Sequence, residues 1–365
     1  MKNEERRMRR EGCRIKNNIP QSVIRNPQSH ASALIMVLWV IMILSIIIGS
    51  FAFNAHIEAR ITSYYRKRTK AEYLARSGIT VAEMLMIRRG DAKTSGDEVS
   101  EHEEEWWFSS AKKLSEGLAV RGFVHELGGG TITLDIVPEP ALRNVNKLTV
   151  EDWERMFEVC NVPEEIWPGL IDSFFDWIDK DNDPRLDGAE TEDYYGTIEE
   201  PGPYQAKNGP LDTVDELLLV KGFDETILYG EEVKAEYEED EALPIRGIAD
   251  FLTTYGDGKV NVNAASIDVL MTLPSMDKLI ADKIIEEREG WLDEEGEQED
   301  HSFEGTSDLF ARIPDLPPSM RSYVTTGSAV FRITAIGAVH NVKRKVSCIV
   351  KFYKEKIIIL RWEEG

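Results

Sequence analysis

The chain has 365 residues, 42% of them hydrophobic, and it contains three cysteines. The hydrophobic content excludes an intrinsically disordered chain, and so few cysteines exclude a disulfide scaffold. Lys and Arg number 43 and Asp and Glu number 66, so the formal charge of −23 excludes a generally basic nucleic-acid binder. Residues 1–31 carry eight Lys or Arg against three Glu, so a basic head precedes a strongly acidic body.

An uncharged apolar run of 21 residues covers 33–53, directly after the basic head. A helix of that length reaches across the hydrocarbon of a bilayer, so the run predicts a membrane span. A secretory signal peptide would have a shorter apolar run followed by a small-residue cleavage motif, which is not clear here. Apolar residues then recur at irregular helical spacing from Ile57 to Leu85. We therefore expect one helix of about 50 residues, half in lipid and half packed on a soluble body.

The soluble body is predicted to combine strands at both ends with helices between them. Residues 118–137 surround Gly128-Gly129-Gly130 and predict a hairpin, and 328–362 predict three more strands. This order predicts an α+β fold, in which the long N-terminal helix packs on an antiparallel sheet that carries a large, mainly helical insertion. The predicted parts are a basic leader at 1–31, an N-terminal helix at 32–90, a first part of the sheet at 91–140, the insertion at 141–325 and C-terminal strands at 326–365.

Four sequence blocks, in this order, resemble one family. They are SALIMVLWVIMILSIII from residue 32, FFDWIDKDNDPRLDGAETEDYYG at 174–196, KNGPLDTVDELLLVKGF at 207–223 and GKVNVNAASIDVL at 258–270. Together they are similar to the protein K family of the type II secretion system, whose members are large minor pseudopilins. The resemblance implies a pilin-like fold and a place at the tip of the pseudopilus, where the protein starts or caps assembly for export of folded proteins across the outer membrane.

The resemblance also implies how the N-terminus is processed. A membrane peptidase of the system would cut between Ala31 and Ser32 and methylate the new amine, although the residue before the cut is usually Gly. Met36 would then be the fifth mature residue, where most pilins carry a Glu that pairs with the amine of the neighbouring subunit above. Met36 cannot make that pair, which suits a tip position. The simpler interpretation, one more lipid-facing residue, stays open.

Location and partners follow from the same resemblance. The chain is expected to be a single-pass protein of the bacterial inner membrane, with its body in the periplasm and with minor pseudopilins I and J as partners. Two alternatives stay open, a minor pilin of a related type IV pilus and a membrane-anchored DNA receptor like those of competence systems. No enzyme motif is present, and the six histidines lie at no metal-ligand spacing, so catalysis is not expected.

An acidic loop predicts a calcium site. Counted from Asp179, acids fall at positions 1, 3, 5, 9 and 12 (Asp179, Asp181, Asp183, Asp187 and Glu190), which is the ligand spacing of an EF-hand loop. Asp193 lies just beyond, and Asp176 precedes the loop on the expected helix. Pro184 occupies the position of the usual turn glycine, so the loop is not a true EF-hand. The alternative is a solvated acidic turn, and the family resemblance favours calcium.

Two further points concern the insertion. Residues 260–289 are similar to a helix-hairpin-helix module of DNA-binding proteins, but the turn Pro274-Ser275-Met276-Asp277 has no glycine and adds a carboxylate. Since the body is strongly acidic, nucleic acid is not an expected partner. Acidic runs at 231–242 and 286–300 are interpreted as solvated segments. Whether Cys160 and Cys348 pair is left open by the sequence.

Overall fold

The computed structural model describes residues 28–92, 104–200, 202–231, 243–290, 301–353 and 356–365. The leader up to residue 27 and most of both acidic runs therefore lie outside the described residues. The chain divides into two compact units, Met1–Tyr64 and Tyr65–Gly365. The described part of the first unit is helical, and the second unit contains the sheet and the insertion.

A single helix, α1 (Gln28–Ala92), contributes to both units. It begins directly after Pro27 and contains no proline, which allows its 65 residues to keep their backbone hydrogen bonds. From Leu34 to Phe53 its large apolar side chains are exposed, whereas Leu74, Ala75 and Leu85 are buried. The same helix therefore has an uncovered apolar half and a half that packs on the soluble body, as the sequence predicts.

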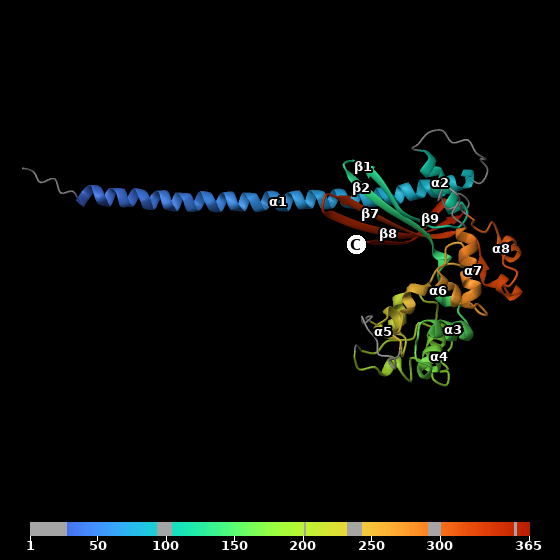
Figure 1. Ribbon diagram of the computed structural model, residues 1–365. Coiled ribbons are helices and arrows are strands. Elements are labelled where there is room, and N and C mark those ends of the chain that lie inside the picture. Colours follow the sequence, from blue (N-terminus) through green and yellow to red (C-terminus); the bar gives the residue numbers. More distant parts are fainter. Residues whose placement is uncertain (1–27, 93–103, 201, 232–242, 291–300, 354–355) are drawn as a thin grey trace, which may run out of the picture. The chain divides into compact units, whose positions relative to one another are not determined.

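Five antiparallel strands form the main sheet, in the order β1-β2-β7-β8-β9 (Figure 1). They are β1 (Val120–Leu127), β2 (Gly130–Pro138), β7 (Val330–Val339), β8 (Val342–Tyr353) and β9 (Lys356–Glu364). Pro138 at the end of β2 pairs with Phe331 near the start of β7, so the chain leaves and re-enters the sheet at adjacent points. The predicted split sheet, with its halves far apart in sequence, is confirmed.

The helix packs closely on one face of this sheet. Ala75, Ile79, Ala82 and Leu85 of α1 share a core with strand residues such as Ile333. Gly78 lies at the closest approach, because a Cβ there would be 2.8 Å from both the Ala335 and Ile132 side chains. Gly78, the glycine that interrupts the helical pattern of the sequence, therefore allows the helix backbone to approach the sheet closely. The helix α2 (Glu104–Ser115) adds Leu114 to this core.

The insertion between β2 and β7 consists of short helices joined by loops and two-residue strands. Its α-helices are α3 (Val150–Val159), α4 (Trp167–Ile178), α5 (Glu225–Tyr229), α6 (Ile267–Met271), α7 (Lys278–Glu289) and α8 (Thr306–Arg312). Its strand pairs are β3 (Arg143–Asn144) with β4 (Leu252–Thr253), and β5 (Val260–Asn261) with β6 (Val324–Thr325). Its 3-10 helices are Glu139–Ala141, Val145–Lys147, Glu164–Ile166, Tyr195–Thr197, Val214–Leu219, Ile248–Phe251 and Pro318–Ser322.

The insertion has a hydrophobic core of its own, centred on Trp153. Its ring lies 4.9 Å from that of Phe174 and 5.8 Å from that of Phe223, both at steep angles. The segment TVDELLLVKG, expected to be helical, forms only a 3-10 helix over Val214–Leu219. The chain turns soon afterwards at Gly222, whose φ of +89° lies outside the right-handed helical region and favours glycine.

Two polar clamps fasten the insertion, one to the α2–β1 connection and one to strand β7 of the sheet. In the first, the Asn263 side-chain amide donates to the carbonyl oxygens of Glu116 (2.7 Å), Phe303 (2.9 Å) and Thr326 (3.1 Å). In the second, the buried Glu139 carboxylate accepts from the Arg332 guanidinium on β7, at 2.7 and 3.0 Å, and from the Thr253 hydroxyl. These bonds join segments that lie 40 to 193 residues apart in the sequence.

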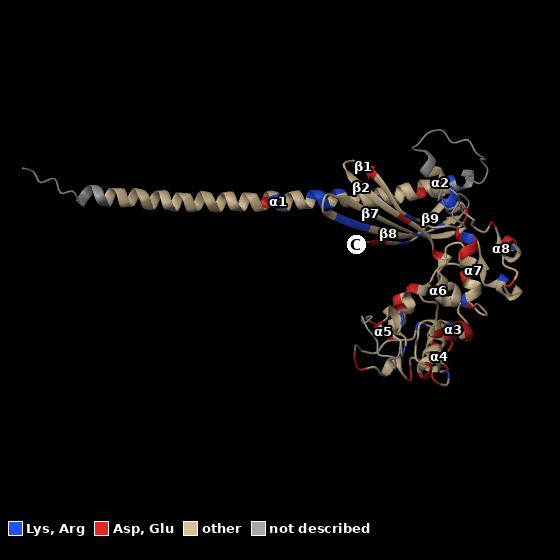
Figure 2. Ribbon diagram, viewed as in Figure 1, with Lys and Arg blue, Asp and Glu red and all other residues tan. Residues whose placement is uncertain are grey.

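Charge is segregated in the second unit (Figure 2). Lys and Arg gather on α1 at 66–70 and at the start of β8, whereas Asp and Glu mark the helices and loops of the insertion. Cys160 and Cys348 are both buried and free, so the pairing left open by the sequence is not made in this structure.

Candidate metal centre

The acidic loop begins where α4 ends. Pro168 opens this helix, and Leu170, Phe174 and Trp177 form its buried side. Trp177 packs edge-on against Tyr195, with ring centroids 5.1 Å apart, so the two ends of the loop are held by one aromatic contact. After Asp179 the chain leaves the helix as an extended loop, and the 3-10 helix Tyr195–Thr197 follows instead of a second EF-hand helix.

Three of the predicted acids meet in this loop. Asp179, Asp181 and Glu190 each offer a carboxylate oxygen, and these oxygens all lie within 4.8 Å of one another. Glu190 is only 1% exposed. Neither of its oxygens accepts a hydrogen bond of normal geometry from the described residues, and the same holds for Asp179 Oδ1. Because buried carboxylates without partners are costly, the cluster requires either protons or a cation.

The electrostatics of the cluster lead to the same requirement. Burial raises the pKa of Glu190 to about 7, and the charges of Asp176 and Asp179 add to this rise. The backbone amide of Thr191 opposes the rise without forming a hydrogen bond of normal geometry. The pKa of Asp179 is also raised, first by burial and then by Asp181. A bound divalent cation would reverse these shifts, since it stabilises the charged form of every carboxylate around it.

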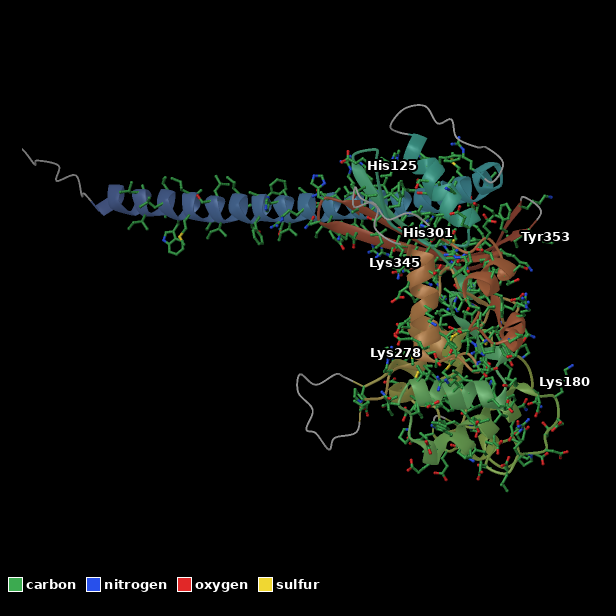
Figure 3. The ribbon with its side chains drawn as sticks, turned by 45° about the vertical axis from the view of Figure 1, so that its right-hand side comes forward. His125, Lys180, Lys278, His301, Lys345 and Tyr353 are labelled. Carbon is green, nitrogen blue, oxygen red and sulfur yellow. The ribbon has the colours of Figure 1, made fainter. Side chains whose placement is uncertain are left out.

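The other predicted ligands lie outside this cluster. Asp183 and Asp187 have exposed side chains, and the backbone amide of Asp187 donates to Asp172 of α4. Asp193 Oδ1 accepts from the Glu190 amide at 2.8 Å. Lys180, between the first two cluster acids, projects from the insertion into solvent (Figure 3). The six-residue ligand set therefore stays a prediction, and the geometry points first to Asp179, Asp181 and Glu190.

All three cluster ligands are carboxylates, and no histidine or cysteine belongs to the cluster. Hard oxygen ligands suit calcium, which accepts six to eight of them, better than zinc. The three acids would supply part of such a shell, and backbone carbonyls and water would complete it. The chemistry of the donor set therefore fits calcium.

The predicted processing and register residues lie on α1. Ala31 and Ser32 belong to this helix, and Met36, one turn further on, has an exposed side chain. By length and composition alone, the helix has a segment able to cross a membrane, and the most apolar part of it has no covering in the structure. The predicted cleavage bond therefore lies within the first turns of α1, directly before the apolar run.

The predicted helix-hairpin-helix consists of α6 and α7. Ser275 adopts a φ of +57° in the turn, in the left-handed region that favours glycine. Asp277 caps α7 by accepting from the Ile280 amide, so a carboxylate occupies the helix N-terminus where a phosphate would bind. Arg155 of α3 donates to the carbonyls of Met271 and Met276 and packs the hairpin into the insertion. The hairpin is a packing unit in this structure.

Comparison with known proteins agrees with the motifs. A family model described as type II secretion system protein K matches residues 135–229, which include the acidic loop. The type II secretion system protein K of Pseudomonas aeruginosa is 27% identical over 263 residues, which are 70% of this chain and 71% of that protein.

A solved structure shares the fold. It is a chain of the GspK-GspI-GspJ complex from the type 2 secretion system of enterotoxigenic Escherichia coli, with a TM-score of 0.55 and 14% identity, covering 84% of this chain and 99% of that chain. The predicted pilin-like α+β fold is therefore confirmed. None of these names refers to an enzyme. The chain is thus related to protein K of the type II secretion system, which confirms the resemblance of its sequence motifs.

Proposed function

We propose that this chain is a minor pseudopilin that occupies the tip of the pseudopilus of a type II secretion system and starts or caps its assembly. The observation that carries the proposal is α1, a single helix with an exposed apolar half and a half packed on the sheet. Such a helix joins a lipid anchor to a folded body. The large insertion supports the tip position, because it adds bulk that a further subunit above would have to displace.

The anchor lies in the inner membrane and the body in the periplasm. The leader is cut between Ala31 and Ser32, and the new terminus is methylated. Met36 then offers no carboxylate to the amine of another subunit, which removes the need for a neighbour above. Mass spectrometry of the membrane fraction tests this step. An N-methylated terminus at Ser32 is expected, and an intact leader or a cut after residue 53 would contradict it.

The partners are the minor pseudopilins I and J, which pack helix to helix on α1. Beyond the apolar run, large side chains on this helix remain exposed at Ile57, Ile61, Tyr73, Met84 and Ile87. Co-purification of the full chain with both partners tests this surface. Met84→Glu on α1 should weaken the complex, whereas Leu279→Glu on α7, also exposed, should leave it intact. Equal binding by both variants would place the contact elsewhere.

The acidic loop binds calcium through Asp179, Asp181 and Glu190. The ion neutralises the three carboxylates and orders the loop, so it stabilises the folded state by linkage. EGTA should lower the melting temperature of the full chain, and calcium should restore it better than magnesium. Glu190→Gln should abolish that response, while Glu192→Gln, an exposed neighbour, should keep it.

A double variant, Asp183→Asn with Asp187→Asn, tests whether these two acids at EF-hand positions are also calcium ligands. Loss of the calcium response in this double variant would extend the ligand set to the exposed side of the loop. If the melting temperature of the unaltered chain ignores both EGTA and calcium, the loop is a solvated acidic turn and the metal assignment fails.

A further inference from the structure

Asp176 lies beside the acidic cluster. It is in the last turn of α4, three residues before Asp179, and it is completely buried. Its Oδ2 accepts from the backbone N–H of Ala189 at 2.8 Å and from that of Arg185 at 3.1 Å, and its Oδ1 lies 3.3 Å from the same Arg185 nitrogen. One carboxylate therefore holds the loop at two points, the second directly before Glu190.

The loop comes so close to this carboxylate that it needs a glycine. A Cβ at Gly188 would overlap Asp176 Oδ2. The φ of Gly188 is not positive, so the reason for glycine is the approach of the carboxylate and not the backbone conformation. Gly188 and Ala189 are both buried, and they lead directly into Glu190 of the cluster.

Asp176 and the cluster acids differ in how their oxygens are used. Both Asp176 oxygens already face backbone donors, whereas Glu190 and Asp179 Oδ1 have unpartnered oxygens aimed into the cluster. The Arg185 guanidinium, 3.7 Å from Asp176 Oδ1, further offsets the charge of this buried group. The contacts of Asp176 are those of a residue that fixes the conformation of the loop. The unpartnered oxygens of Glu190 and Asp179 are available to bind an ion.

We propose that Asp176 is a positioning residue that holds the Arg185–Ala189 segment against α4, so that Glu190 faces Asp179 and Asp181 before any ion binds. This inference rests on the calcium site proposed above. Residues that orient ligands without touching the metal commonly contribute about 10- to 100-fold in metal affinity. We expect a loss of that size when the Asp176 contacts are removed.

Calcium titration of the full chain in detergent, by calorimetry and by melting temperature, tests the proposal. Asp176→Asn keeps the size of the side chain but replaces one acceptor oxygen by a donor that opposes a backbone N–H, so calcium affinity should fall about 10- to 100-fold. Gly188→Ala moves the loop away from the Asp176 carboxylate without removing an acidic residue, so calcium affinity should fall by a similar factor. Asp172→Asn is the matched control, because Asp172 also lies on α4 and accepts one loop amide, that of Asp187.

The rise in melting temperature on addition of calcium distinguishes a positioning role of Asp176 from a purely structural one. A purely structural role would lower the melting temperature equally with and without calcium, whereas a positioning role shrinks the rise itself. An unchanged rise in Asp176→Asn would overturn the proposal, as would a loss in Asp176→Asn with full affinity in Gly188→Ala, which would make Asp176 a ligand. Absence of calcium binding by the unaltered chain would instead overturn the metal site.

Discussion

The contact between α1 and the sheet predicts that Gly337 tolerates no side chain. Gly337 lies on β7 and faces α1, and a Cβ there would overlap the Ala71 carbonyl oxygen and lie 2.6 Å from the Ala75 nitrogen. Unstrained contacts between such atoms begin near ~3.5 Å, so the helix would have to move away by about 1 to 1.5 Å. The obstacle is helix backbone, which cannot rotate aside as a side chain can.

Gly337→Ala should therefore cost at least about 3 kcal/mol, the upper end of the usual range for overpacking, because the helix would lift away from Leu74 and Ala75. For a unit of this size that lowers the melting temperature by roughly 6 °C or more. Near-UV circular dichroism of the detergent-solubilised full chain measures it. Gly327→Ala is the control, since a Cβ at Gly327 meets no atom within 4 Å. Equal melting of the two variants would refute the close contact between helix and sheet.

Three further predictions concern the insertion and the thiols. Arg143→Met should destabilise the chain by about 3–5 kcal/mol in urea unfolding, because it strands the buried Asp152 carboxylate, and a cost below about 1 kcal/mol would contradict this. Burial raises the pKa of the Cys160 and Cys348 thiols to about 12. Ellman's reagent should therefore react with neither thiol in the folded chain and with both after unfolding. Rapid reaction of either thiol in the folded chain would contradict this prediction. In gel shifts the chain should not bind DNA at physiological salt, and a micromolar, salt-sensitive complex would support the DNA-receptor alternative.

Elements with local signals were predictable from the sequence. The helix α1 follows from a long run without proline, and the β1–β2 hairpin follows from Gly128-Gly129-Gly130 between alternating strands. Two of the four family blocks, at 174–196 and 207–223, lie within the residues 135–229 that the family model matches. The sequence could not reveal what Asn263 of the block 258–270 does, since it donates to the carbonyls of Glu116, Phe303 and Thr326, which only the folded chain brings together.

The candidate metal site shows the same limit. Spacing alone identified the loop, but it counted Asp183 and Asp187 as equal to Glu190, although only Asp179 and Asp181 join Glu190 in the cluster of close carboxylate oxygens. Which acids converge depends on the turn that Asp176 imposes through Ala189, and no linear count includes that bond. In the sequence, Pro184 at the position of the usual glycine already indicated that the loop does not follow EF-hand geometry.

The two clamps at the root of the insertion have a mechanical consequence. An insertion that is joined to a sheet only by its two peptide connections is free to rotate about them. Here Glu139 with Arg332 and Asn263 with its three carbonyls hold the insertion at separate points. Contacts at separate points should therefore restrict rotation of the insertion relative to the sheet. Arg332→Met removes one of the two clamps and should loosen the insertion without altering α1 or the acidic loop.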